Sequence, residues 1–428
     1  MDPGSIYRWL KRRLYFLIAH YFRIFARVRL YIWRPRVIVV TGSSGKTTLL
    51  HMIQSVLGQR ARYSHNANST FGIPFDILGI KRSRLVPSEW IYLFVMAPLC
   101  IFKKTYPEKI YVAEVDCERP GEGKFLASLL KPEVTLWLNS GKTHTANFDN
   151  LVKAHKFKSV EEAVAYEFGH LLDNTDKLAI INGDDKLELA ELVRYRGKRE
   201  LVTDGELTAY SLDATGTEFT IGESRYRFKS ILPRDSFYSI AMTLRLASYL
   251  GMVDNLSFTD FTLPAGRGGI LRGIKDTRLI DSTYNATPDG MRATLQTFTS
   301  YPAERKWLVL GDMIELGEEE EGEHKLLAGL LQNVDADKII LVGRRVTRYT
   351  YPALLAYIDR PESVVCYEQP SEALEYIKSN IEGGEAVLFK GARFLEGIIE
   401  HLLKDKSDVA KLCRREEIWQ TRRKKWNL

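Results

Sequence analysis

Apolar residues in this chain recur in short runs, many of them β-branched, separated by longer amphipathic stretches. In the first half, the runs that predict buried strands are 37–40, 109–115, 134–138 and 178–181. In the second half they are 277–280, 307–310, 338–342, 363–366 and 386–389. Helical stretches lie between them. Because strands that alternate with helices are typical of a mostly parallel sheet, the pattern predicts an α/β protein.

The N-terminal segment has a different pattern. Residues 5–33 alternate large apolar side chains with Arg and Lys at roughly helical spacing, and residues 1–36 hold nine Arg or Lys against one Asp. The longest uncharged run, residues 14–22, has nine residues, whereas a transmembrane helix needs about 20. Two interpretations remain open: a helix lying in a membrane interface, or a helix packed on the body with its Arg side chains in water.

A second apolar run covers residues 90–102, with Pro98 inside it and Lys103 and Lys104 after it. It is too short to span a bilayer. Such a run predicts a core helix, and the alternative is a second membrane contact.

The length and composition of the chain limit how many domains it can form. Its 428 residues predict two or three domains, and a cluster of Gly, Pro and Arg at 262–276 suggests a boundary. The domains expected are a basic amphipathic segment at 1–36, a central domain at 37–265, a C-terminal domain at 266–405 and a basic tail at 406–428. The four cysteines are scattered without metal-binding spacing, so a reducing cytosol is the expected setting. No nucleic-acid module is recognisable.

The first predicted strand leads into a phosphate-binding sequence. Residues 37–48 read V-I-V-V-T-G-S-S-G-K-T-T, and an amphipathic run follows, so the order is strand, loop, helix. The residues expected to hold a nucleotide are Gly42, Ser43, Ser44, Gly45, Lys46, Thr47 and Thr48. Glycines let backbone N–H groups turn towards an anion, the lysine reaches phosphates, and a threonine hydroxyl holds Mg²⁺. Val40 replaces the first glycine of the full pattern, and the alternative is an ordinary turn.

Polar side chains follow two other predicted strands. Glu114 and Asp116 end the run at 109–115, and His144 follows the run at 134–138. The carboxyl ends of parallel strands are where open α/β sheets bind ligands. These residues are therefore candidates for a site beside the phosphate loop.

Five separated segments together resemble the Mur ligases, a family of ATP-dependent amide-forming ligases of peptidoglycan synthesis. They are T-G-S-S-G-K-T-T at 41–48, N-A-N-S-T-F-G-I-P at 66–74, D-S-T-Y-N-A-T-P at 281–288, L-G-D-M-I-E-L-G at 310–317 with His324, and K-G-A-R at 390–393. The resemblance covers about residues 36–403. It implies a P-loop central ATPase domain with a mostly parallel sheet, followed by a C-terminal Rossmann-like α/β domain.

The resemblance also implies roles for single residues. Lys46, Glu114 and His144 fall at catalytic positions, and Thr47, Glu114 and His144 at positions related to Mg²⁺. Those at the nucleotide-contacting segment are Arg267, Asp281, Tyr284 and Asn285. Lys390 and Arg393 fall on the side of the amino substrate. The cofactors implied are ATP and Mg²⁺.

The chain departs from the family pattern at several points. Phe168 stands where the family has a lysine that is carbamylated, and residues 235–239 read D-S-F-Y-S where H-N-x-x-N is usual. Ser69 and Thr70 replace the usual Asn and Glu. Only about 36 residues precede the phosphate loop, too few for the family's UDP-sugar-binding domain, so that domain is expected to be missing.

The sequence therefore predicts an ATP-dependent ligase that joins a carboxylate to an amine through an acyl phosphate. Its expected partners are a small-molecule or lipid-linked carboxylate, an amino acid or dipeptide, and an anionic membrane surface, with no nucleic acid. The expected location is the cytoplasm, peripherally on the inner face of the membrane. The alternative function is a catalytically weakened ATP-binding scaffold at the membrane.

Overall fold

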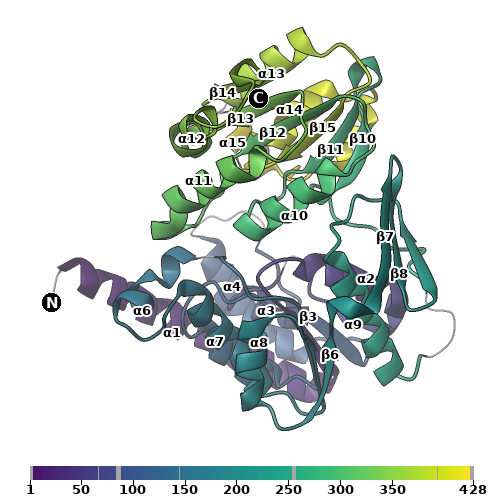
Figure 1. Cartoon of the computed structure of the whole chain (residues 1–428). Coiled ribbons are helices and arrows are strands. Elements are labelled where there is room, and N and C mark those ends of the chain that lie inside the picture. The colour runs from purple at the N-terminus through teal and green to yellow at the C-terminus, as the bar shows by residue number, and fades with distance from the viewer. Residues whose placement is uncertain are drawn as a thin grey trace. The chain divides into compact units, whose positions relative to one another are not determined.

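The computed structural model describes residues 3–65, 67–82, 88–143, 145–252, 257–392 and 394–424. The chain forms two compact units (Figure 1). Unit 1 comprises Met1–Ser140, Phe157–Val202 and Met242–Val253. Unit 2 comprises Gly141–Lys156, Thr203–Ala241 and Asp254–Leu428.

Unit 1 is built on a six-stranded parallel sheet with the order β2-β3-β1-β4-β5-β6. The strands are β1 (Arg36–Thr41), β2 (Ala61–Tyr63), β3 (Ile110–Glu114), β4 (Val134–Trp137), β5 (Leu178–Asn182) and β6 (Lys198–Val202). All four strands predicted for the first half are present. Their apolar runs are buried almost without interruption, as expected for parallel strands covered on both faces.

The helices of unit 1 include those that carry the site and those that support it. They are α1 (Pro3–Trp33), α2 (Lys46–Leu57), α3 (Gly72–Leu78), α4 (Glu89–Leu99) with the 3₁₀ turn η2 (Cys100–Phe102), α5 (Glu122–Leu130), α7 (Val160–Asp173) and α8 (Lys186–Glu191) with η4 (Leu192–Arg194). Helix α9 (Ser236–Tyr249) runs from unit 2 into unit 1.

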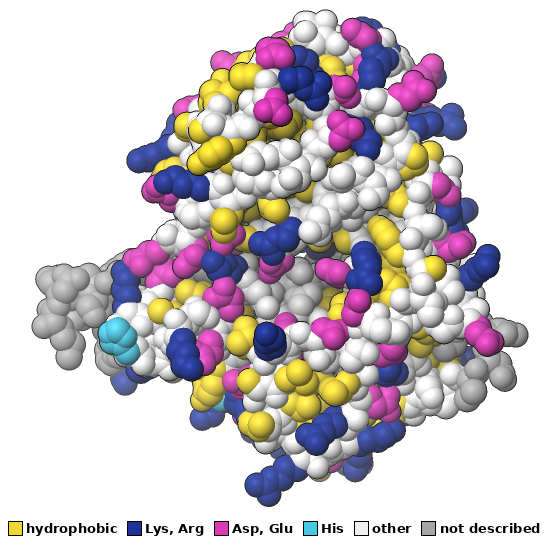
Figure 2. Space-filling model, in the orientation of Figure 1, with side chains coloured by type: hydrophobic (Ala, Val, Ile, Leu, Met, Phe, Trp, Pro, Cys, Tyr) yellow, Lys and Arg dark blue, Asp and Glu magenta, His cyan; other side chains and the backbone are white. Residues whose placement is uncertain are grey.

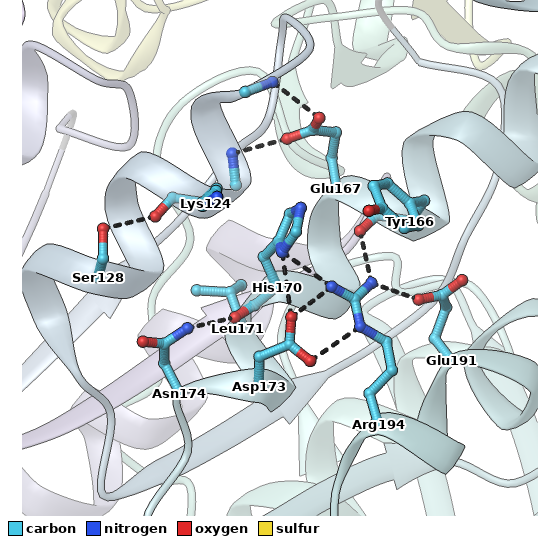
Figure 3. A network of polar contacts seen from close by, with 12 residues as sticks. Lys124, Ser128, Tyr166, Glu167, His170, Leu171, Asp173, Asn174, Glu191 and Arg194 are labelled. Carbon is cyan, nitrogen blue, oxygen red and sulfur yellow. Dashed lines mark hydrogen bonds and ion pairs between the residues drawn. The ribbon is translucent and has the colours of Figure 1, made fainter. Parts of the chain in front are cut away.

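Helix α7 is held by charged side chains at its middle and at its C-terminal end (Figure 3). The Glu167 carboxylate accepts hydrogen bonds from Gly121 N (2.7 Å) and Gly123 N (3.0 Å), which are donors at the start of α5. The Arg194 guanidinium donates to the carboxylates of Asp173 and Glu191. These contacts fix α7 against α5 on one side and η4 on the other.

The N-terminal helix packs on unit 1 and also remains partly exposed. Phe22, Ala26 and Trp33 are completely buried, and Trp33 Nε1 donates to Glu108 O at 2.7 Å. Leu14 and Leu17 are exposed. The buried side of α1 is therefore packed on the body, as one interpretation expected, whereas contact of the exposed side with a membrane stays a prediction. Within the described residues, no helix combines the length and the apolar character needed to cross a membrane.

Unit 2 has a six-stranded sheet with the order β10-β11-β15-β12-β13-β14, in which only the β10–β11 pairing is antiparallel. Its strands are β10 (Gly269–Arg272), β11 (Arg278–Ser282), β12 (Lys306–Gly311), β13 (Lys338–Val342), β14 (Val364–Tyr367) and β15 (Ala386–Lys390). Successive residues alternate between two cores: Leu308 and Leu310 lie in one, and Trp307 and Val309 lie in the other. The sheet is therefore covered on both faces.

The helices of unit 2 are α6 (Asp149–Lys153), α10 (Pro288–Thr299), α11 (Glu320–Leu331), α12 (Tyr351–Leu355), α13 (Pro370–Asn380), α14 (Leu395–Leu402) and α15 (Glu417–Lys424). Unit 2 also contains a three-stranded antiparallel sheet that the apolar pattern did not predict. Its strands are β7 (Leu207–Asp213), β8 (Gly216–Ile221) and β9 (Ser224–Phe228). Many of its side chains are exposed, so these strands lack the continuous apolar runs from which the others were predicted.

The basic tail is folded against the rest of unit 2. Arg414 pairs with Glu396 on α14 at 3.2 Å, and both Arg415 and Arg423 pair with Glu400. Much of the positive charge at 406–424 is thus neutralised locally. On the face drawn in Figure 2, cationic and anionic side chains are interspersed.

Candidate functional site

The phosphate loop lies between β1 and α2, at the carboxyl end of the central strands of unit 1. Gly42 and Gly45 have φ of 140° and 77°, in the region that favours glycine. A Cβ on Gly45 would lie 2.6 Å from Leu138 Cδ2, and one on Gly42 would lie 3.1 Å from Asn139 N. Both glycines are therefore required by the turn and by the close passage of the chain that follows β4.

Asn139 fastens this loop to the end of β4. Its backbone O accepts from Ser43 N at 3.0 Å, its side-chain Oδ1 accepts from Ser44 N at 2.9 Å, and its Nδ2 donates to Ser44 O at 3.1 Å. Asn139 was not among the predicted site residues. The signal that could have found it is its position directly after a buried strand, where the carboxyl edge of a parallel sheet gathers polar groups.

Lys46 is folded back over the loop. Its Nζ donates to Gly42 O at 2.6 Å and forms an ion pair with Asp116 Oδ2 at 2.9 Å, and both side chains are nearly buried. Asp116 follows β3, so the parallel pairing of β1 with β3 brings these two residues together. The lysine is held by a carbonyl and a carboxylate at the mouth of the loop, where a bound phosphate would offer it further anionic acceptors.

Thr47 and Glu114 also meet at this edge of the sheet. Thr47 Oγ1 donates to Glu114 Oε2 at 3.0 Å, and Asn68 Nδ2 donates to Glu114 Oε1 at 3.5 Å. A hydroxyl and a carboxylate are oxygen ligands of the kind that Mg²⁺ prefers. His144, the third predicted metal residue, lies outside the described residues. Within the described part of the chain, no three His, Cys, Asp or Glu residues are grouped so that they could hold a metal ion.

These residues fit Mg-ATP on chemical grounds. The loop offers backbone N–H groups, a helix N-terminus and a lysine to phosphate oxygens, and Thr47 with Glu114 offers oxygen atoms to Mg²⁺. Thr48 is half-buried on the first turn of α2.

The predicted residues of unit 2 form a second cluster. Asp281, which is buried, accepts hydrogen bonds from Thr283 N (3.1 Å) and Thr283 Oγ1 (2.6 Å). Burial raises the pKa of the Asp281 carboxyl. The Arg267 guanidinium lies over the Tyr284 ring, 4.2 Å from its centroid, so Arg267 is held in place by a cation–π contact.

Lys390 belongs to the same cluster. It is buried at the end of β15, and its Nζ donates to Asn285 O at 3.2 Å. Burial, together with the positive charge of Arg267, lowers the pKa of Lys390 to about 8. Arg393 lies outside the described residues. Arg414, which sequence reasoning did not include, donates to Thr283 O at 3.1 Å and to Tyr284 O at 2.6 Å and thereby ties the C-terminal segment to this cluster.

Phe168, at the position aligned with the family's carbamylated lysine, is completely buried. Its ring packs edge-on against Trp137, with centroids 5.9 Å apart. The side chain is thus part of the core between α7 and β4.

Two family models match this chain. The Mur ligase middle domain matches residues 40–245, and the glutamate ligase domain of Mur ligases matches residues 266–393. The chain belongs to the Mur ligase family. The predicted family and fold class are therefore confirmed, and so is the prediction, at the level of the family, of an ATP-dependent ligase.

Particular relatives are similar over most of the chain. The UDP-N-acetylmuramoyl-tripeptide–D-alanyl-D-alanine ligase of Bacillus subtilis (strain 168) is 25% identical over 394 residues, which cover 86% of this chain and 75% of the relative. The ligase of the same name from Escherichia coli (strain K12) is 26% identical over 72% of this chain and 65% of its own length. The fold is similar to that of the MurF ligase from Thermotoga maritima in complex with ADP, with a TM-score of 0.70, 20% identity, and coverage of 94% of this chain and 84% of that chain.

Proposed function

We propose that this protein is an ATP-dependent, ADP-forming ligase that joins a carboxylate to an amine through an acyl phosphate. The observation that carries the proposal is the polar arrangement at the carboxyl edge of the unit 1 sheet. There the phosphate loop, the Lys46–Asp116 pair and the Thr47–Glu114 pair all lie at the ends of β1 and β3.

ATP supplies the phosphoryl group that activates the carboxylate, and Mg²⁺ supplies positive charge to its phosphates. The residues of this chain position the reactants and neutralise the negative charge of the phosphates. Loop N–H groups and Lys46 hold phosphate oxygens, and Thr47 with Glu114 orients the metal, together with His144 by family resemblance. The proposed nucleotide contacts in unit 2 are Arg267, Asp281, Tyr284 and Asn285.

The proposed amino substrate is an amino acid or a dipeptide, with D-alanyl-D-alanine, named for the relatives, as the first candidate. Lys390 and Arg393 are proposed to bind its carboxylate. The carboxylate donor is a peptide carried either on a soluble molecule or on a lipid. The proposed place of reaction is the cytoplasm, where ATP is supplied.

The test is ADP release measured with paired panels of peptidyl carboxylates and amines. Release should require both substrates, and hydroxylamine in place of the amine should trap the activated carboxylate as a hydroxamate. Glu114→Gln should lower both signals at least tenfold, because the metal loses a charged ligand. Exposed Glu223→Gln, on the β8–β9 turn, should leave them unchanged.

Two outcomes of this experiment would oppose the proposal. Release that needs neither substrate would identify a plain ATPase. ATP binding without release across the whole panel would favour the catalytically weakened scaffold. The replacement of the family's carbamylated lysine by Phe168 also favours it.

A further inference from the structure

Unit 1 carries an exposed apolar surface formed by two helical segments. Of the nineteen large hydrophobic side chains that are exposed among the described residues, eleven lie on these segments. They are Leu14, Leu17, Ile24, Val28, Tyr31 and Ile32 on α1, and Ile91, Tyr92, Val95, Leu99 and Phe102 on α4 and η2. We call these eleven residues the two-helix face. Exposed apolar side chains gathered in this way, and not scattered singly, mark an interaction site.

The two-helix face is the outer side of helices that already have a packed side. On α1, the residues Ala19, Phe22, Ala26, Arg29 and Trp33 are three or four positions apart and at most 2% exposed. The exposed residues of α1 have similar spacing but lie on the other side of the helix. On α4, Leu93 and Ala97 are buried while Ile91 and Val95 are exposed. The exposed residues are therefore those that the packing of the core does not bury.

The two helices are joined to each other by polar and aromatic contacts. Tyr21 on α1 donates to Phe94 O on α4 at 2.7 Å, and the Phe22 and Phe94 rings lie 5.2 Å apart. Buried Arg29 donates to Lys103 O and, at 2.5 Å, to Lys104 O, just beyond η2. These contacts join α1 to α4 and η2, so the exposed apolar residues of both helices belong to one connected part of unit 1.

Positive charges accompany this face. Arg13 and Arg27 are exposed, and their spacing of fourteen positions puts them on one stripe along α1. Arg34 is exposed directly after the last residue of the helix. Lys103 and Lys104 are exposed directly after Phe102. Residues 3–36 contain no Asp or Glu, and Glu89 at the start of α4 pairs with Arg82 at 3.8 Å. An apolar surface edged by cations complements an anionic interface with an apolar interior.

We propose that the two-helix face docks on an anionic lipid bilayer, with its apolar side chains at the level of the headgroups and upper acyl chains and its Arg and Lys side chains on lipid phosphates. Two copies of the chain joined through this face would bring two positive rims together, so charge favours the bilayer over a second copy. The inference goes beyond the proposed ligase activity, which rests on other residues of unit 1. It places that activity at a membrane surface.

The test is flotation of the full chain with vesicles of phosphatidylcholine and phosphatidylglycerol in equal amounts. The chain should bind at low salt, bind more weakly as salt is raised, and bind poorly to pure phosphatidylcholine. The triple variant Leu17→Glu, Val95→Glu, Phe102→Glu should bind about a hundredfold more weakly, because three exposed apolar contacts become anionic. Lys103→Gln with Lys104→Gln should weaken binding about tenfold or more.

The matched control replaces three residues of similar exposure elsewhere: Val193→Glu, Leu326→Glu and Tyr357→Glu. It should bind vesicles as the unaltered chain does. Thermal unfolding and ATP binding report whether each variant is folded, and Phe102→Glu alone, at a side chain that is 86% exposed, serves if the triple variant is destabilised. Absence of binding to anionic vesicles, equal binding to neutral ones, or an equal loss in the control would overturn the proposal. So would dimers in sedimentation that the triple variant abolishes, which would assign the face to a second copy.

Discussion

At the scale of single residues, Lys46 is the most constrained member of the site. Its ammonium group is nearly buried and contacts both the Gly42 carbonyl and the Asp116 carboxylate. A nucleotide phosphate would add an anionic acceptor at a helix N-terminus, where negative charge is already favoured. The proposed function therefore makes Lys46 the residue whose loss should most directly weaken nucleotide binding.

Lys46→Ala should weaken Mg-ATP binding at least tenfold, about 1.4 kcal/mol or more, because the phosphates lose their cation. Isothermal titration calorimetry measures the affinity for Mg-ATP. The control is Lys177→Ala, since Lys177 is an exposed residue that pairs with neighbouring Asp176; this variant should bind ATP normally. Lys46→Met keeps the aliphatic stem and checks that the loss does not come from unfolding around Asp116. Normal affinity in a folded Lys46 variant would remove the phosphate loop from nucleotide binding.

At the scale of elements, the packing of α5 on α7 supports the site because α5 follows the loop that carries Asp116. Gly123 allows the two helices to approach closely: a Cβ there would lie 2.0 Å from Glu167 O. Glu167 uses this closeness to accept both Gly121 N and Gly123 N. One missing side chain and one carboxylate thus set the distance between two helices.

Gly123→Ala should lower the thermal unfolding midpoint, with a cost of about 1–3 kcal/mol, since the backbone of α7 must move to accommodate the new methyl group. Gly329→Ala on α11 is the matched control, because a Cβ there meets nothing within 4 Å. Helix propensity alone would make that control neutral or up to about 1 kcal/mol more stable. If both variants unfold at the same temperature, the close approach of α5 and α7 contributes little to stability.

At the scale of the whole molecule, the net charge of +7 is unevenly distributed. In the tail, Arg414, Arg415 and Arg423 pair with Glu396 and Glu400, whereas exposed cations accompany the two-helix face. Charge close to a membrane would therefore come mainly from the N-terminal part of the chain. This difference arises in the folded protein, because the sequence makes both ends similarly basic.

The stability of the molecule should also depend on pH through His324. This buried imidazole accepts from Met313 N at Nε2 (3.2 Å), and its Nδ1 donates to Glu320 O (2.7 Å), which together require the neutral form. Burial lowers the pKa of His324. As pH falls below the ordinary value of about 6.5, the unfolded chain binds the proton first, so stability is lost. Above that pH, this contribution is fully present.

Comparison with His324→Asn isolates this effect, because asparagine keeps a donor for Glu320 O but does not titrate. The unaltered chain should be the more stable at pH 7.5, and its advantage should shrink at pH 5.5. Denaturant unfolding at the two pH values measures this difference. His170, whose pKa is also lowered by burial and by Arg194, is present in both proteins and cancels. An advantage that stays constant with pH would show that His324 is not the titrating group.

The sequence by itself determined the parts of this protein that depend on neighbouring residues. A β-branched run, two glycines, a lysine and two threonines predicted the strand, the loop and the helix that follow one another from Arg36 to Leu57. Continuous apolar runs likewise predicted β1, β3, β4 and β5 of the first sheet and the five parallel strands of the second, because buried strands need such runs. The edge strands β2 and β6 were not predicted, since β2 has three residues and β6 is largely exposed. The β7–β9 sheet was not predicted, because half-exposed strands have a weaker pattern of apolar residues.

Only the tertiary structure decided which distant residues meet. Asn139 reaches Ser44 across 95 positions, and Lys46 meets Asp116, because the strand order places β4 and β3 on either side of β1. The same holds for α1, whose pattern of apolar and basic residues was compatible with packing and with exposure. Contacts with α3, α4 and η2 buried one side of it and left the other side in solvent. Local chemistry specifies elements, whereas pairing between elements depends on burial summed over the whole fold.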